Sequence, residues 1–461
     1  MAHARPLTFG EVPFSLRADH TNLLLLPPGS SDYDDEVALP DDVRPMTFDR
    51  LRPSAVRSDQ TTVRRSNLGV VLQQVAAAGR CSRARIAAET GLTRGTVSSL
   101  VAELIDLELL RETGEDESPG RVGRPAQTLE LGDVAVAIGL EVNVDYLAVS
   151  VEDLTGRIRY ERRVFVDNRR SAAGPVLDRL ARMARRALQE TERQRRLVVG
   201  AGVAVPGLVE VASGALLRAP NLGWSRLDLA DELRRRLPGL PLRVENEANL
   251  AALAESWLGS VRDVRSFICV FGEIGVGAGI FVDGELHRGA HGFGGEFGHI
   301  TVDRDGAVCA CGSRGCLETL VGQEVIARAA GIPIPSGGRT RSVTDELVRR
   351  ATDGDPKVLA ELELAGITLG DALASAVNLF DLDAVVLGGC FGPLSPWLVG
   401  AVEEALKRRV LSAEWSTCRV FGSALGELAA VRGAAALVLR EVLGAPWLVG
   451  ERRLARNEAA S

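Results

Sequence analysis

One short stretch of the sequence gathers an imidazole and three thiols. His299 is followed by nine residues and then by Cys309, Cys311 and Cys316. Such side chains can close a tetrahedron around Zn²⁺, and the glycines between the last two cysteines let the loop wrap the ion. Because the protein would fill every position of the tetrahedron, no water is left to be activated, and the spacing predicts a structural zinc site. A chance cluster of free thiols is the alternative.

The overall composition fits a soluble globular protein, with 46% apolar and 25% charged residues. The seven cysteines are an odd number, and three of them crowd into eight positions, which favours a metal site in a reducing compartment over a disulfide framework. No apolar run reaches the roughly 20 residues needed to span a bilayer. We therefore expect a cytoplasmic protein with no membrane partner.

The elements that must position these ligands are typical of an α/β protein. Three strand patterns, a helical pattern and a buried-strand pattern occur in succession, and the same order begins again from Phe267. The expected elements of the first set cover residues 134–140, 146–151, 158–166, 176–190 and 197–205. A repeated set of this kind predicts a body of two α/β lobes.

The sequence before this body predicts three short helices. The first begins near Asn67 and ends at Gly79, the second covers residues 83–90 after Ser82, and Gly91 supplies a turn before the third. Apolar residues recur at helical spacing on one face of the first and third helices. Two helices joined by a glycine turn indicate a helix-turn-helix, with a plain helical hairpin as the alternative.

The third helix carries short or basic side chains that suit DNA. Thr93 can cap it, and the predicted DNA contacts here are Thr93, Arg94, Thr96, Ser98 and Ser99. Between Arg50 and Leu100 there are nine arginines and two acidic residues, although the net charge of the chain is −7.

A β-wing is predicted to follow the third helix. Arg121 and Arg124 lie among glycine and proline just before the alternating residues 128–131. Arginines at the tip of a wing suit the negative potential of a narrow minor groove. We therefore expect a winged helix-turn-helix with these two arginines as further DNA contacts.

The zinc motif also resembles a known family. The pattern G-H-x9-C-x-C-G-x2-G-C-x-E is similar to the signature of the ROK family of repressors, open reading frames and sugar kinases, and the winged helix resembles its repressor branch. The resemblance extends from about Ser66 to about Leu443. Supporting segments are residues 200–207, 219–224, 245–249 and 387–389. The resemblance implies an actin-like (ribonuclease H-like) fold with sugar and nucleotide sites between two lobes.

The resemblance also implies a set of sugar contacts. These are Asn246, Glu247, Glu296, His299 and Glu318, with His299 using one ring nitrogen for zinc and the other for the sugar. Carboxylates and amides suit a polyol, which offers many hydrogen-bond donors that need partners. For Glu296 and Glu318, support of the zinc ligands is the alternative role.

The sequence departs from the kinases of the family at the nucleotide site. Glu247 stands where the kinases have a catalytic aspartate, and displacement of a carboxylate by about an ångström can cost roughly 10²-fold in rate. The first phosphate loop, D-x-G-G-T in the kinases, is Glu141-Val-Asn-Val-Asp145, and the second reads Glu273-Ile-Gly275. We predict that phosphotransfer is lost, because carboxylates replace groups that approach phosphate.

Together these patterns predict a sugar-responsive DNA-binding regulator that represses genes of carbohydrate metabolism. Its partners would be a sugar or sugar derivative and a palindromic operator bound by a homodimer or a dimer of dimers. The predicted divisions are a disordered tail (1–60), a winged helix-turn-helix (61–131), a ROK body (132–445) with its zinc loop (296–318), and a C-terminal tail (446–461). The alternatives are a sugar kinase with weak residual activity and a zinc-stabilised interaction scaffold.

Overall fold

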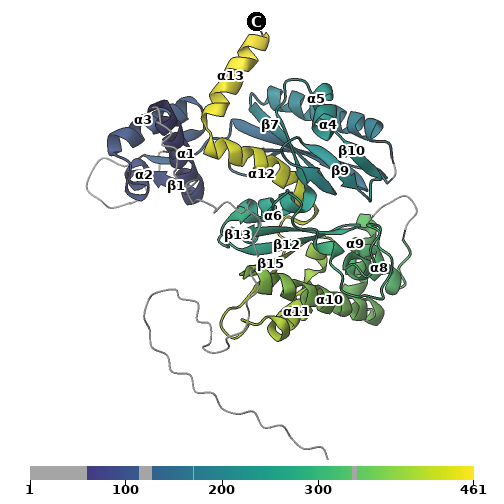
Figure 1. Cartoon of the computed structure of the whole chain (residues 1–461). Coiled ribbons are helices and arrows are strands. Elements are labelled where there is room, and N and C mark those ends of the chain that lie inside the picture. The colour runs from purple at the N-terminus through teal and green to yellow at the C-terminus, as the bar shows by residue number, and fades with distance from the viewer. Residues whose placement is uncertain (1–59, 114–126, 170, 335–339, 461) are drawn as a thin grey trace, which may run out of the picture. The chain divides into compact units, whose positions relative to one another are not determined.

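The computed structural model describes residues 60–113, 127–169, 171–334 and 340–460 (Figure 1). The predicted disordered tail lies outside these residues, apart from its last position. No helix in these ranges is both long and apolar enough to cross a bilayer.

The N-terminal domain combines three helices with a three-stranded antiparallel sheet of order β1-β3-β2. The elements are α1 (Gln60–Ala78), β1 (Arg80–Ser82), α2 (Arg83–Thr90), α3 (Arg94–Asp106), β2 (Leu110–Thr113) and β3 (Thr128–Leu131). A helical hairpin would lack this sheet, so the predicted winged helix-turn-helix is confirmed.

Local capping explains the turn between α2 and α3. Ser82 accepts a hydrogen bond from the backbone N–H of Arg85, and Thr93 accepts one from Thr96 at 3.2 Å. Gly91 ends α2 with φ of 71°, a left-handed conformation that glycine adopts without steric cost.

The body contains two five-stranded sheets of the same topology. In each lobe the first three strands in chain order are antiparallel neighbours, and the last two run parallel to the first. The first sheet contains β4 (Ala135–Val142), β5 (Tyr146–Asp153), β6 (Ile158–Phe165), β7 (Leu197–Val205) and β11 (Leu242–Asn246). The second contains β12 (Phe267–Gly272), β13 (Val276–Val282), β14 (Glu285–Leu286), β15 (Ala384–Gly389) and β16 (Arg419–Gly422). This repeat confirms the predicted actin-like, two-lobed body.

A smaller sheet and a set of helices complete the two lobes. The sheet is formed by β8 (Leu208–Glu210), β9 (Ala215–Ala219) and β10 (Trp224–Leu227). The helices are α4 (Ala173–Arg193), α5 (Leu229–Arg236), α6 (Glu247–Leu258), η1 (Phe297–His299), α7 (Glu318–Val321), α8 (Gln323–Ala329), α9 (Thr340–Thr352), α10 (Pro356–Phe380), α11 (Phe391–Arg409), η2 (Gly426–Leu428), α12 (Ala429–Gly444) and α13 (Trp447–Ala460).

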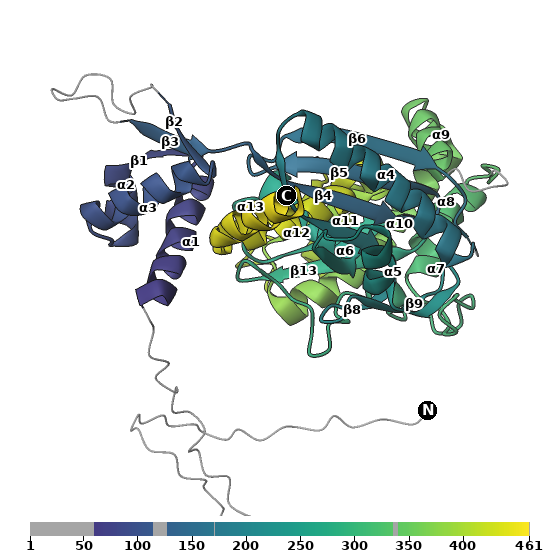
Figure 2. The same cartoon turned by 90° about the horizontal axis from the view of Figure 1, so that it is seen from above.

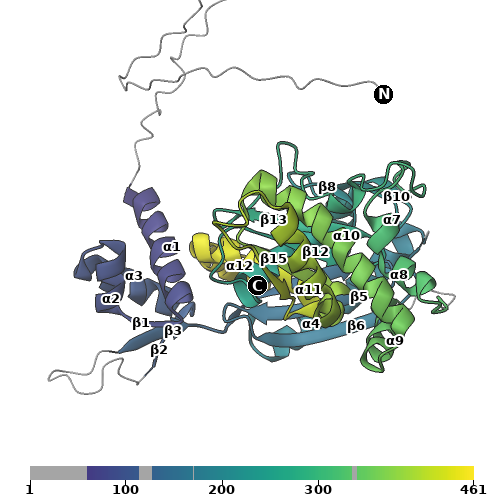
Figure 3. The ribbon, with the colours of Figure 1, turned by 90° about the horizontal axis from the view of Figure 1, so that it is seen from below.

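Alternation along β4 shows how the first sheet is covered on both faces. Val136, Ile138 and Leu140 share a core with α4, while small residues face α12 (Figure 2). A Cβ at Gly139 would lie 1.9 Å from the carbonyl oxygen of Val431, so only glycine allows α12 to pack this closely. In the second lobe α11 packs on β15 and β16, and α10 packs on α11 (Figure 3).

The winged helix and the first lobe share one apolar core. This core joins Val71 and Leu104 of the winged helix to Leu197 of β7 and Leu439 of α12. A Cβ at Gly69 would lie 2.6 Å from the carbonyl oxygen of Gly444, which means that α1 and α12 meet backbone to backbone.

Within the predicted C-terminal tail, residues 447–460 form the helix α13. Val449 is fully buried in the same shared core. Arg453 pairs with Glu108 and donates to the backbone carbonyls of Asp106 and Leu107, at the end of α3. Tertiary partners, which local periodicity does not reveal, therefore hold this helix.

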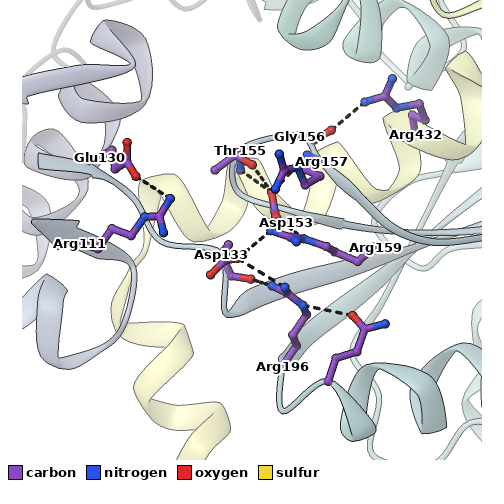
Figure 4. A network of polar contacts seen from close by, with 11 residues as sticks. Arg111, Glu130, Asp133, Asp153, Thr155, Gly156, Arg157, Arg159, Arg196 and Arg432 are labelled. Atoms are coloured by element: carbon purple, nitrogen blue, oxygen red, sulfur yellow. Dashed lines mark hydrogen bonds and ion pairs between the residues drawn. The ribbon is translucent and has the colours of Figure 1, made fainter. Parts of the chain in front are cut away.

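The connection between the winged helix and the body is fixed by ion pairs (Figure 4). Asp133, between β3 and β4, pairs with Arg159 at 2.7 Å and with Arg196 at 3.4 Å. Arg159 also pairs with the buried Asp153 at 2.5 Å. These ion pairs hold the segment between β3 and β4 against the first lobe.

Candidate functional site

The four predicted metal ligands lie together. One ligand atom from each of His299, Cys309, Cys311 and Cys316 falls within 4.8 Å of every other. His299 Nδ1 lies 3.6 Å from Cys309 Sγ, and Cys311 Sγ lies 3.7 Å from Cys316 Sγ. A tetrahedral zinc site has S···S edges of about 3.8 Å and S···N edges of about 3.6 Å. The donor set and its spacing therefore fit Zn²⁺.

The loop that presents these ligands depends on a glycine. Gly315 has φ of 63°, and a Cβ there would lie 1.4 Å from the carbonyl oxygen of Asp303. Short β-bridges join Thr301 to Cys316 and Val308 to Arg314, so the loop folds back beside His299. The local chain path brings the thiols to the imidazole.

His299 and Glu318 each have one polar atom beside the thiols and another directed away from them. His299 Nδ1 points to the thiols, whereas Nε2 lies 3.8 Å from Glu296 Oε2. Glu318 Oε1 lies 2.8 Å from Cys309 Sγ, whereas Oε2 would lie 3.1 Å from a Cβ at Gly275 on the pocket side. The geometry thus permits both roles considered for Glu318, which are support of the predicted zinc ligands and contact with a sugar.

All the predicted sugar contacts line one cavity of about 250 Å³. Its walls include Asn246, Glu247, Glu296, His299 and Glu318. The cavity is smaller than the roughly 300 to 1,000 Å³ of sites for drug-sized ligands, which suits a monosaccharide.

The sequence analysis missed two polar residues of the cavity wall, Arg218 and Asn221. Arg218 Nη2 lies 3.4 Å from the carbonyl oxygen of Cys311, between β9 and the zinc loop. Asn221 Nδ2 would lie 3.1 Å from a Cβ at Gly275. The segment 219–224 was noted as a motif, so the signal for Asn221 was present.

Asn246 has a structural role as well as a place in the cavity. Its Oδ1 accepts the N–H groups of Ala248 and Asn249 and caps α6, and its Nδ2 donates to the carbonyl of Gly207 at 3.0 Å. These bonds leave one amide N–H. Asn246 can therefore act toward a hydroxyl only as a donor.

Glu247 lies at the boundary between the cavity and a buried group of carboxyls. Burial raises its pKa to about 8, with further increases from the nearby charges of Glu141 and Glu296. Its Oε2 has no hydrogen-bond partner among the described residues. At neutral pH the side chain holds a proton and can donate to a hydroxyl.

The buried group of carboxyls beside Glu247 comes from the two predicted phosphate loops. Burial raises the pKa of Glu141 to about 7, and Tyr146 donates to its Oε1 at 2.7 Å. Burial and the neighbouring Glu247 and Glu141 raise the pKa of Glu273 well above its usual range. Arg163 lies over the ring of Tyr146 and pairs with Glu427 at 2.5 Å.

The predicted DNA contacts of α3 divide into two groups. Arg94 and Ser98 are exposed on its surface. Thr93 is engaged as the cap and bonds Thr96, and Ser99 accepts a hydrogen bond from Arg64 of α1 at 3.3 Å. Arg121 and Arg124 lie outside the described residues.

Comparison with known proteins agrees with this architecture. The profile of the ROK family matches residues 137–441, and that of the MarR family matches residues 70–121. The chain belongs to the ROK family. It is 28% identical to the xylose repressor of Bacillus subtilis over 84% of this chain and 98% of that protein. It is also 28% identical to the transcriptional dual regulator NagC of Escherichia coli, over 83% of this chain and 94% of that one.

Solved structures extend the likeness to both branches of the ROK family. A ROK transcriptional regulator described as a homologue of the E. coli MLC protein covers 85% of this chain and 99% of its own, with TM-score 0.69 and 28% identity. A ROK glucokinase from Streptomyces griseus, in complex with glucose and AMPPNP, covers 66% of this chain and 98% of its own, with TM-score 0.57 and 28% identity. The regulator, unlike the kinase, matches well beyond the ROK body.

Proposed function

We propose that this ROK protein is a sugar-responsive, DNA-binding transcriptional regulator that represses genes of carbohydrate metabolism. One observation carries the proposal: a chain with a winged helix also gathers hydroxyl-binding side chains from both lobes around one monosaccharide-sized cavity. The relatives named as a xylose repressor and as NagC, matched over most of their length, support it.

We propose that His299, Cys309, Cys311 and Cys316 hold one structural zinc ion. The metal would supply a fixed crosslink for the loop. Neutral His299 would bind it through Nδ1, which leaves Nε2 turned toward Glu296 and the cavity. The chain thereby fixes the imidazole that meets the ligand.

In the proposed pocket some side chains accept hydrogen bonds from the hydroxyls of the sugar and others donate hydrogen bonds to them. Glu296 and Glu318 accept hydrogen bonds, and Asn246 donates one through its free N–H. Glu247 can donate or accept, because its raised pKa keeps a proton on it near neutral pH. A polyol offers both donors and acceptors and can satisfy all of these groups.

The kinase alternative draws support from the similarity to the glucokinase. Against it stand the two predicted phosphate loops, Glu141-Val-Asn-Val-Asp145 and Glu273-Ile-Gly275, in which other residues replace glycines that let backbone amides approach a nucleoside triphosphate. Glu247 also stands in place of the catalytic aspartate. We infer that phosphotransfer is absent. Turnover of ATP with D-glucose, D-xylose or N-acetylglucosamine at the ordinary rate of about 1 to 10³ s⁻¹ would overturn this inference.

Ligand binding is proposed to reach DNA through α6 and α12. The helix α6 starts at the cavity, and a Cβ at Gly433 of α12 would lie 1.8 Å from the carbonyl oxygen of Leu250 of α6. The far end of α12 meets α1 at Gly69 and Gly444. A change in the angle between lobes would therefore alter the spacing of two winged helices in a homodimer on a palindromic operator.

The direct test is selection of operator DNA by the purified protein, followed by titration with and without each sugar. One sugar should change operator affinity by about 5- to 150-fold, and DNA should change the affinity for that sugar by the same factor. Arg94→Ala should weaken operator binding by about 1 to 3 kcal/mol, with Arg179→Ala on α4 as control. Absence of any selected DNA would contradict the proposal.

A further inference from the structure

An ion pair between a buried glutamate and a partly exposed arginine joins the two lobes. Glu245, at the end of β11, is 1% exposed, and its Oε2 accepts the Nε–H of Arg288 at 2.7 Å. Arg288 belongs to the second lobe and follows β14. Neither residue is among the described residues that line the cavity. The pair is therefore placed to act on the cavity walls, not on a ligand directly.

On the first-lobe side, Glu245 organises the start of α6. Its Oε1 accepts the backbone N–H of Asn246 at 3.0 Å and the side-chain Nδ2 of Asn249 at 3.1 Å. Asn249 is itself buried. Because Asn246 lines the cavity and keeps one amide N–H, a shift of Glu245 would move a potential donor to a ligand.

On the second-lobe side, Arg288 begins the glycine loop that ends at Glu296. The N–H of Gly294 donates to the carbonyl of Arg288 at 2.8 Å, which closes the loop at its base. Gly295 has φ of 99°, and a Cβ there would lie 2.1 Å from the carbonyl oxygen of Ala278. The hydrogen bond at the base of the loop and the close packing of Gly295 against Ala278 connect the positions of Arg288 and Glu296.

We propose that Glu245 and Arg288 are the positioning pair of the effector site. They hold Asn246 and Glu296, which come from opposite lobes, at the spacing that a bound sugar bridges. The inference rests on the proposed function, since it concerns the same cavity. Removal of Arg288 leaves the buried Glu245 carboxylate uncompensated, whereas removal of both charges relieves that penalty without restoring the link.

The test uses the full-length, zinc-loaded protein and isosteric or near-isosteric variants. Glu245→Gln, Arg288→Gln and the double variant are titrated calorimetrically with D-xylose, D-glucose and N-acetylglucosamine. Arg243→Gln is the matched control, because Arg243 also lies on β11 and pairs with an acidic residue, Glu441 of α12, at 2.7 Å. Zinc content and operator affinity without sugar are measured for each protein.

Each single variant should lose about tenfold in affinity for the sugar that the wild type binds, and the double variant should lie within about threefold of the weaker single one. Arg243→Gln should match the wild type, and zinc content and sugar-free operator affinity should be unchanged throughout. Wild-type sugar affinity in both single variants would overturn the inference. So would a parallel loss of zinc or operator binding, because that result indicates general unfolding.

A second measurement needs no ligand. Amide hydrogen exchange in residues 289–295 should be faster by about tenfold in Glu245→Gln and Arg288→Gln, and unchanged in Arg243→Gln. Equal exchange in all proteins would overturn the inference. If the wild type binds none of the three sugars, the proposed function loses its support, and this exchange measurement still decides whether the pair positions the loop.

Discussion

The two ends of the cleft differ in whether their polar side chains remain available to hydrogen-bond a ligand. At the sugar end, Asn246 keeps one free N–H, and Glu296 and His299 Nε2 face the cavity. At the end formed by the predicted phosphate loops, Glu141 accepts a hydrogen bond from Tyr146, and Arg163 forms an ion pair with Glu427. Hydrogen-bonding capacity is thus left open for hydroxyls where a sugar would bind. At the other end Glu141 and Glu273 are buried, and that burial raises their pKa values.

The largest expected effect tests the sugar end through its zinc loop. Cys316→Ser should abolish zinc binding and the response to sugar, because Cys316 is a fully buried predicted ligand and structural zinc in peptides contributes about 10 to 16 kcal/mol. Metal analysis and sugar titration check this result. Cys418→Ser, at a half-buried cysteine outside the loop, should keep both properties. Protein that contains no zinc before mutation would contradict the prediction.

Loss of one hydroxyl acceptor should have the next largest effect. Glu296→Gln should weaken sugar binding by about 10- to 100-fold, since a hydrogen bond to a charged group contributes about 1.5 to 3 kcal/mol. Zinc content and sugar-free operator binding should stay unchanged. Glu285→Gln, an exposed substitution on β14, is the control. Full sugar affinity and full response in Glu296→Gln would show that this end of the cleft is not the sensor.

Glu247, at the boundary between the two ends, should affect the pH dependence of stability. Burial raises the pKa of Glu247 to about 8, so the folded state holds a proton that the unfolded state, with its ordinary value near 4.5, has released. The free energy of unfolding should therefore fall as pH rises toward 8 and level off above it. In Glu247→Gln the fall between pH 6.5 and 9 should be smaller, by on the order of 1 kcal/mol. Identical denaturation profiles for the two proteins would contradict the assignment.

The smallest effect expected concerns Asn221, the amide on the cavity wall that the sequence analysis missed. Asn221→Ala should weaken sugar binding by about 2- to 10-fold, as expected for one neutral hydrogen bond of about 0.5 to 1.5 kcal/mol. Calorimetry with the sugar bound by the wild type measures the change. An unchanged dissociation constant would show that the ligand does not contact Asn221. Its contacts would then lie on the side of the cavity formed by the zinc loop.

The sequence alone determined the features that depend on neighbouring residues. The zinc ligands lie within one loop, and the caps Ser82 and Thr93 stand beside the helices that they begin. Repeated strand patterns predicted two lobes, because hydrophobic periodicity reports local burial. Family resemblance then placed Asn246 and Glu296 in one pocket.

Only the tertiary structure decided the features that join distant parts of the chain. Glu245 meets Arg288 across 43 positions, and α13 is held by the winged helix far earlier in the sequence. Two further properties appear only in the folded chain. Asn246 uses most of its hydrogen-bonding atoms in capping α6, and burial raises the pKa of Glu247. These properties depend on which groups replace water around a side chain, and local sequence does not specify that environment.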